Sequence, residues 1–140
     1  MKPGCILQTT ILSVFLLFGV GIAQAQYDTE ILRAKIPFAF NIGQHSYAPG
    51  DYSLKRSLQH TLMLRDDRGV TLTSIATNPM EALVAPNTGK LVFNGYNGRY
   101  FLSQIWEPGN TNGQEVIKSP VEKEIVRTPP ELNEISLITH

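Results

Sequence analysis

The 140-residue sequence has a single cysteine, Cys5, and this scarcity excludes several kinds of chemistry. Cys5 precedes the apolar run at the amino terminus, so a chain cleaved after that run contains no cysteine. Such a chain can form no disulfide bond, thiol nucleophile, cysteine metal site or iron–sulfur cluster. A domain of this kind depends on its apolar core for stability.

The sequence also lacks an excess of charge of either sign. Twelve Lys and Arg residues balance twelve Asp and Glu residues, which gives a formal net charge of zero. Loss of Lys2 with an amino-terminal leader leaves eleven basic and twelve acidic residues. A nearly neutral chain gives no reason to expect nucleic acid, an anionic membrane surface or a polyacidic substrate as partner.

The common catalytic motifs are absent as well. Beyond the amino-terminal run there is no G-x-S-x-G, no Ser-x-x-Lys and no glycine-rich phosphate loop before a helix. Asp66 and Asp67 are adjacent in a predicted turn, where their carboxylates point in different directions and are solvated. The sequence therefore predicts no catalytic residue, no cofactor and no enzyme.

Metal ligands are also too few. His45 and His60 are fifteen residues apart beside polar turns, and a metal site needs three or four converging ligands. Asn110 to Glu115 is rich in oxygen atoms but lacks the early carboxylates of a calcium loop. We therefore predict no metal site.

The amino terminus has the pattern of a cleavable signal peptide. Lys2 is followed by a twelve-residue apolar run, Ile11 to Ile22, and then by small residues at Ala23 and Ala25. The run is shorter than the roughly 20 residues that cross a bilayer. We predict a signal peptide over 1–25, export to the periplasm or the medium, and membrane contact only through the signal before cleavage.

The remaining residues predict one domain. We find no internal repeat, low-complexity tract or linker that would divide them. The pattern favours a single β-rich domain over 26–130, followed by a tail or short strand over 131–140. Alternating apolar residues predict strands at Lys35 to Ile42, Tyr52 to Arg56, Thr61 to Arg65 and Val70 to Thr77, the last ended by Asn78-Pro79.

The most strongly patterned segment is Lys90 to Trp106, which predicts a β-hairpin. A two-residue turn at Asn97-Gly98 pairs Phe93 with Leu102, whereas a four-residue turn pairs Phe93 with Tyr100. In both registers one face carries Leu91, Phe93, Tyr100, Leu102, Gln104 and Trp106, and the other carries Val92, Phe101 and Ile105. Because both faces are apolar, we expect both to be covered.

Ser119 and Pro120 mark the start of a helix. Ser119 has the N-cap pattern, with Pro120 at the first helical position and Glu122 at the third. Val121, Ile125 and Val126 would form the apolar face of this helix. The predicted fold is mainly β, a small antiparallel meander of six to eight strands with one short carboxy-terminal helix, arranged either as a barrel or as a sandwich.

Several short motifs occur in a familiar order: Ile36 to Phe40, Tyr47 to Tyr52, Leu64-Arg65, Lys90 to Phe93, Tyr100 to Trp106 and Lys118-Ser119. Over roughly 36–127 this order resembles a group of short, exported, uncharacterised β-rich proteins found mainly in acidobacteria. In that group the first turn more often reads Leu-Pro-Ala-Gly, and a His-Arg pair often follows the Val-Phe. Tyr47 to Gly50 and Asn94-Gly95 depart from this pattern. The resemblance implies export and a β-rich fold, and it implies no activity.

Aromatic residues are the most plausible ligand or partner surface in the sequence. This set comprises Tyr47, Tyr52, Tyr96, Phe101 and Trp106. Such side chains can line a cavity or a platform for an apolar ligand or a sugar, and they can equally form the core of a cysteine-free domain.

Three functional classes follow from these patterns. The favoured one is an exported, non-enzymatic β-domain that binds a protein partner, associates with itself or belongs to the cell envelope, with the tail adding a strand to a partner's sheet. The alternative is a carrier or sensor of a small apolar or carbohydrate ligand. An enzyme would need a site assembled from His45, Asp51, His60 or the acidic turn.

Overall fold

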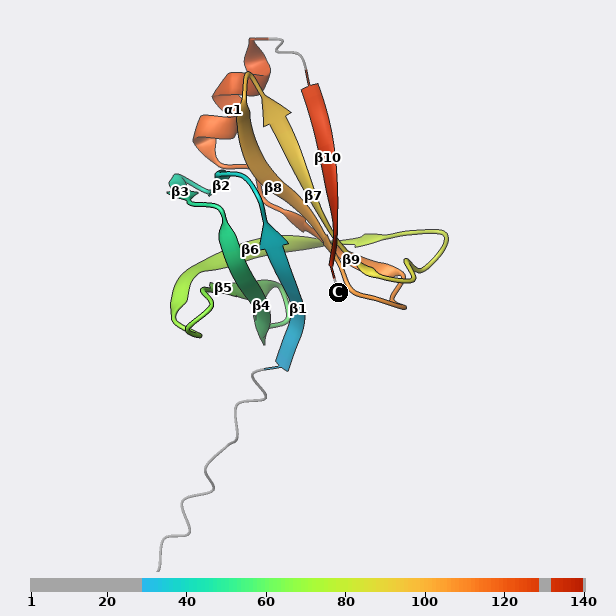
Figure 1. The fold of residues 1–140 in the computed structure, drawn as a ribbon. Helices are drawn as coiled ribbons and strands as arrows, with labels where there is room; N and C mark the ends of the chain where they lie inside the picture. The colour runs from blue at the N-terminus through green and yellow to red at the C-terminus, as the bar shows by residue number, and fades with distance from the viewer. Residues whose placement is uncertain (1–28, 129–131, 140) are drawn as a thin grey trace, which may run out of the picture.

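The computed structural model describes residues 29–128 and 132–139, so the predicted signal peptide lies outside the described residues. This part of the chain forms ten strands and one helix, whose arrangement Figure 1 shows. In chain order they are β1 (Thr29–Ile36), β2 (Phe40–Ile42), β3 (His45–Tyr47), β4 (Gly50–Leu58), β5 (Thr61–Arg65), β6 (Thr71–Glu81), β7 (Gly89–Tyr96), β8 (Arg99–Trp106), β9 (Asn112–Val116), α1 (Pro120–Arg127) and β10 (Leu132–Thr139).

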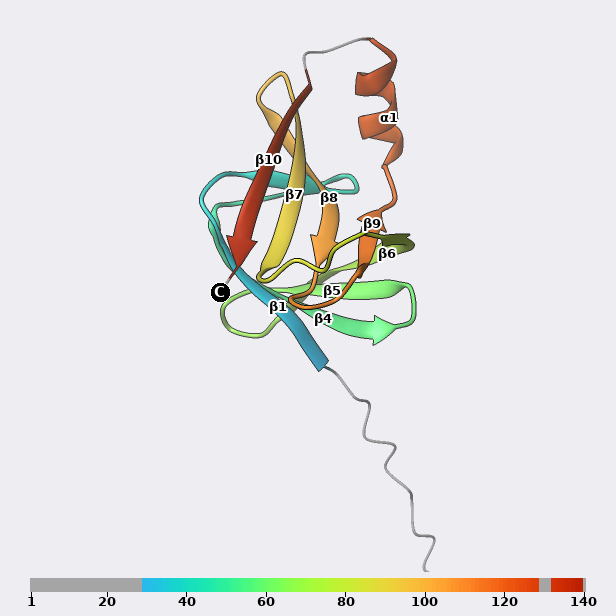
Figure 2. The same ribbon diagram turned by 90° about the vertical axis from the view of Figure 1, so that its right-hand side faces the viewer.

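The strands form one strongly bent, mostly antiparallel sheet with two arms. The first arm has the order β1-β4-β5-β6, and the second has the order β6-β9-β8-β7-β10. β6 belongs to both arms because its first half pairs with β5 and its second half pairs with β9. Figures 1 and 2 show the arms as the lower and upper layers. The mainly β prediction with a carboxy-terminal helix is confirmed.

The sheet is open, as in a sandwich or meander, so of the two predicted alternatives, barrel and sandwich, the barrel is not formed. β1 and β10 are in contact at the two ends of the path, but no ladder joins them among the described residues. One apolar core fills the space between the arms. It is formed by Leu32, Ala34, Ile36, Leu54, Leu62, Leu64 and Ile75 from the first arm and by Leu91, Phe93, Leu102, Ile105 and Val116 from the second, with Phe40 and Ile42 of β2.

The ten described strands exceed the six to eight predicted. β1 begins at Thr29, before the first predicted strand, and the strand predicted from Lys35 to Ile42 is interrupted at Pro37. β6 also continues through Pro79, where we predicted its end. Its ladder with β5 stops at Ala76. Among the described residues, one side of its backbone is therefore outside any ladder beside Pro79 and tolerates a residue without an N–H.

The β7–β8 hairpin has the predicted two-residue turn. Asn97 and Gly98 both have positive φ, 51° and 78°, and Phe93 pairs with Leu102. The ladder then shifts between Val92 and Phe93, because Ser103 is an extra residue in β8. The predicted faces are therefore wrong beyond Ser103, where Ile105 enters the core and Trp106 turns to the other face.

The second face of the hairpin carries α1. The rings of Tyr96 and Phe101 are buried there with centroids 6.0 Å apart, and the Tyr96 hydroxyl donates to Glu122 on the helix. The predicted cap is confirmed, since the Ser119 hydroxyl accepts from the Glu122 N–H at 3.1 Å. The predicted apolar helix face is wrong: Glu122 is buried, whereas Val121 and Val126 are exposed.

The carboxy-terminal segment is a strand, the second of the two forms predicted for it. β10 pairs with β7 along its whole length, from Leu132 opposite Tyr96 to Thr139 opposite Gly89. Ile135 and Leu137 lie opposite Phe93 and Leu91 of the core. The segment therefore extends the protein's own sheet.

Candidate functional site: a charged hollow and an apolar tip

The five aromatic residues of the predicted surface lie in three separate places. Tyr47 and Tyr52 flank Phe40, with centroid distances of 5.5 and 5.2 Å. Tyr96 and Phe101 are buried beside α1 on the opposite face of the sheet. Trp106 is buried at the far end of β8, beside Gly113 and 5.9 Å from the Lys90 ammonium. The structure does not bring these residues together.

The core leaves little space for an apolar ligand. A gap among Leu32, Phe40, Tyr52, Leu54 and other core side chains has a volume of about 10 Å³. Such a space holds about one water molecule. This gap is a packing defect and could not enclose a carried ligand.

The residues considered for a metal or a catalytic site do not cluster. His45 begins β3, and His60 lies in the turn between β4 and β5. Across residues 29–128 and 132–139, no group of three or more His, Cys, Asp or Glu side chains is arranged to hold a metal ion.

Within the same described ranges, the structure contains no helix with the length and apolarity that a membrane crossing requires.

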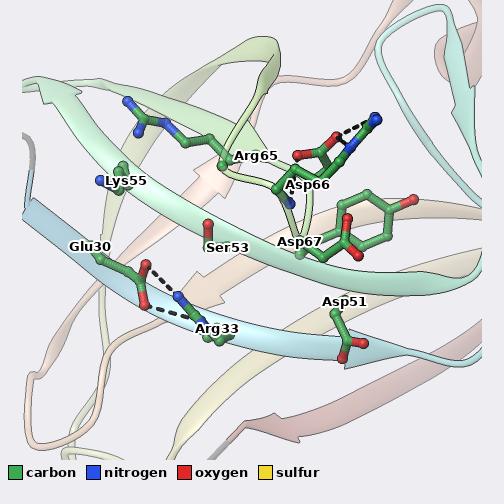
Figure 3. A pocket seen from close by; sticks show the side chains of 11 residues that line it. Glu30, Arg33, Asp51, Ser53, Lys55, Arg65, Asp66 and Asp67 are labelled. Atoms are coloured by element: carbon green, nitrogen blue, oxygen red, sulfur yellow. Dashed lines mark hydrogen bonds and ion pairs between the residues drawn. The ribbon is translucent and has the colours of Figure 1, made fainter.

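A large concavity lies on the outer face of the first arm. This charged hollow has a volume of about 560 Å³ and is lined by Glu30, Arg33, Asp51, Tyr52, Ser53, Lys55, Arg65 and the turn Asp66 to Gly69. Figure 3 shows Ser53 between side chains from β1 and β5. The ladders place Arg33, Ser53 and Arg65 in one row across three strands. The alternation of Asp51, Ser53 and Lys55 along β4 is the sequence signal for this hollow.

The hollow carries charges of both signs. Glu30 pairs with Arg33, and Asp66 pairs with Arg68, each at 3.1 Å. Figure 3 shows Asp51 and Asp67 toward one end and Lys55 toward the other, where Glu30 also lies. The lining therefore offers both acidic and basic groups to a ligand.

The wall of the hollow is a well-ordered turn. The Asp66 carboxylate accepts from the N–H groups of Val70 and Arg68 at 2.9 and 3.0 Å and pairs with the Arg68 guanidinium at 3.1 Å. The hydrogen bond from Val70, together with those from Arg68, lowers the pKa of Asp66. Burial, aided by Asp66, Tyr47 and Asp67, raises the pKa of Tyr52. The turn thus holds its charge in a fixed position.

A second feature is the connection between β6 and β7, which projects at the right of Figure 1. Leu83 and Val84, here called the apolar tip, are 104% and 80% exposed. The base of the connection is fixed, because the Ala82 N–H donates to Thr111 at 2.9 Å and the Gly109 N–H donates to Pro86 at 2.7 Å. The molecule therefore presents two aliphatic side chains on an anchored loop.

We did not predict the apolar tip from the sequence. The sequence pattern that could have identified the tip is an aliphatic pair between two prolines, Pro79 and Pro86. This pair lacks the alternation of apolar and polar residues that would predict a strand.

No protein-family model, curated protein or solved structure matches this chain.

Proposed function

We propose that this protein is an exported, non-enzymatic interaction module that binds a protein partner through the apolar tip. The observation that carries the proposal is the nearly complete exposure of Leu83 and Val84 on a loop whose base is hydrogen-bonded at both ends. Apolar side chains presented in this way gain free energy only when a partner covers them.

The free energy that burial of the tip can contribute is suitable for a specific contact. Full burial of a leucine or valine side chain contributes roughly 1.5–3 kcal/mol, so the tip could contribute about 3–6 kcal/mol. Because the loop is anchored to Thr111 and Gly109, little conformational entropy is lost when the partner binds. The fixed base therefore reduces the part of this contribution that ordering of the loop would offset.

Export is supported by the amino-terminal pattern and by the resemblance to exported β-rich proteins. Intact-mass analysis of the full chain, expressed in a bacterium that secretes proteins, would test it. We expect the chain recovered outside the cytoplasm to lack residues 1–25. Recovery of the full-length chain in the cytoplasm would contradict export.

Photo-crosslinking in the cells that produce the protein would test the interaction. A photoreactive amino acid replaces Leu83 in one variant and Leu58, which is 68% exposed on β4, in the matched control. We expect protein adducts from position 83 and few from position 58. Equal labelling at both positions, or none at position 83, would contradict the proposed function.

A second candidate function is favoured by the charged hollow. Its lining of acidic and basic side chains suits a small zwitterionic ligand rather than the apolar ligand that the aromatic residues suggested. Titration of the glutamyl-lysine dipeptide should shift the amide resonances of Ser53 and Gly69 and reach saturation. Unsaturated shifts that sodium chloride reproduces would show that the hollow is only a solvated surface.

A further inference from the structure

A shallow apolar hollow lies beside the middle of β6, on the other side of the molecule from the apolar tip. It has a volume of about 360 Å³, and its lining includes Ile42, Ala76, Val116, Ile117, Lys118 and Pro120. Ile117 is an aliphatic residue that is 47% exposed there. The lining comes from the β2–β3 turn, from β6 and from the segment between β9 and α1. We call this surface the apolar hollow.

The apolar hollow is large enough for the apolar tip. Since about 10–15 Å³ of such space holds one water molecule, the apolar hollow corresponds to on the order of thirty waters. A leucine and a valine side chain together need less space than that. The two surfaces are therefore matched in polarity and compatible in size.

The tip cannot reach the hollow of its own chain. Ile75 lines the hollow, and β6 continues for six residues to Glu81 before the tip begins. At strand spacing this separation is roughly 20 Å. Figure 1 likewise places the β2–β3 turn and the β6–β7 connection on opposite sides of the molecule. Contact between the two surfaces requires two copies.

The charges beside the two surfaces are opposite. Glu81 is exposed at the end of β6, directly before the tip, and Lys118 is exposed in the lining of the hollow. The two side chains would face each other at the rim of the contact. This complementarity favours a second copy over a partner without a basic group at that place.

We infer that the apolar tip of one copy inserts into the apolar hollow of a second copy, so that copies associate head to tail. The inference rests on the proposed function, because it names the partner that the tip binds. The contact joins two different surfaces. In a pair of copies, the copy that inserts its tip therefore retains a free hollow, and the copy that receives it retains a free tip. Repetition gives a ring if the rotation closes and an open chain if it does not.

Two variants that each lose one surface provide a direct test. The first, Leu83→Ser with Val84→Ser, has a defective tip and an intact hollow. The second, Ile117→Glu, has an intact tip and a hollow that repels Glu81. Sedimentation velocity of the chain from Gln26, which contains every described residue, would follow association from micromolar to millimolar concentration.

Head-to-tail association predicts a specific result for each of these variants. The unmodified chain should grow in mass with concentration, and each variant alone should stay monomeric, with affinity reduced about 100-fold or more. An equal mixture should form a dimer of one copy of each and nothing larger. The control Leu58→Ser should associate like the unmodified chain.

The rim charges provide an independent check. Glu81→Lys and Lys118→Glu should each weaken association about two- to fivefold at low salt, and the double variant should recover it. Circular dichroism would establish that every variant is folded. A monomeric unmodified chain, or a mixture that does not form the dimer, would overturn the inference.

The proposed function and this inference can fail separately. If position 83 crosslinks to a different protein while the purified chain stays monomeric, the interaction module stands and self-association is wrong. If position 83 crosslinks to no protein, both are wrong.

Discussion

The carboxyl group of Glu122 lies in an environment that the sequence did not reveal. The cap pattern indicated only that Glu122 is at the third helical position, whereas the structure shows that Glu122 is 4% exposed and accepts from the Tyr96 hydroxyl at 3.4 Å. Burial raises its pKa, although Lys118 and the hydrogen bonds of Asn94 and Tyr96 oppose the shift. Compared with the unfolded chain, the folded state therefore favours the protonated form of the Glu122 carboxyl group.

This raised pKa predicts how stability depends on pH. In the unfolded chain Glu122 titrates near 4.3, so above that pH the folded state binds more protons. The contribution of Glu122 to the free energy of unfolding is fully present below the pKa of this group in the unfolded chain. It is lost as the pH rises through the pKa of this group in the folded state. Glu122→Gln should therefore gain stability relative to the unmodified chain as pH increases.

Urea denaturation of both chains from acidic to neutral pH would measure this effect. Glu124→Gln, on the exposed side of α1, is the matched control and should show a smaller change. Parallel stability profiles for the Glu122→Gln and unmodified chains would show that burial does not govern this carboxyl group.

Gly113 is required by its contact with Trp106. A Cβ at this position would lie 2.6 Å from two carbon atoms of the indole ring. Gly113→Ala should lower the free energy of unfolding by about 1–3 kcal/mol, the usual cost of overpacking. Gly50→Ala is the control, since its Cβ would meet Tyr52 at an ordinary 3.6 Å. Equal denaturation midpoints for the two variants would contradict this account.

At the scale of elements, the helix start was predictable and the helix face was not. Ser119, Pro120 and Glu122 identify the first turn through local chemistry, because a cap depends only on neighbouring backbone groups. Which side of the helix is buried depends on Tyr96, which is distant in sequence. Periodicity favoured Val121 and Val126, but the sheet beneath the helix offered a hydrogen-bonding partner instead.

The cap itself can be tested. Ser119→Ala removes the hydroxyl that accepts from the Glu122 N–H and should cost about 1 kcal/mol. Ser119→Thr keeps the acceptor and should retain most of the stability. Thermal unfolding followed by circular dichroism would compare them. Similar losses for both variants would indicate a packing effect at this buried position.

The hairpin shows the same limit of sequence reasoning. Asn97-Gly98 specifies the turn locally, and the pairing of Phe93 with Leu102 follows from it. The bulge at Ser103 has no such local signal, yet it moves Ile105 into the core and Trp106 out of it. One extra residue in a strand reverses every face beyond it, so an alternation pattern cannot report it.

For the whole molecule, the sequence predicted the fold class but not how the arms are joined. Period-two patterns identified β4, β5, β7 and β8 because each has one face in the core. The use of β6 by both arms depends on pairing with β9, which lies more than thirty residues away. The apolar tip and the apolar hollow depend on that same shared strand, which explains why neither was predicted.

Removal of β10, the last strand, would test whether the two arms fold as one unit. Half-buried Leu137 packs on the core from β10, and Thr139 is buried near Leu32 of β1. A chain that ends at Thr128 loses this strand and exposes the edge of β7 along its whole length. We expect it to lose cooperative unfolding, whereas Leu137→Ala should remain folded with a loss of about 1–3 kcal/mol.

A synthetic peptide of Glu131 to His140 distinguishes loss of a strand from general misfolding. If β10 contributes by pairing with β7, the peptide should restore the thermal transition of the shortened chain, because an added strand supplies the same backbone hydrogen bonds and the same apolar contacts. A peptide with Leu137 replaced by Ser should restore it less well, since Leu137 reaches the core. A shortened chain with an unchanged transition would mean that β10 is dispensable and that this segment is available to a partner's sheet, as the sequence alone suggested.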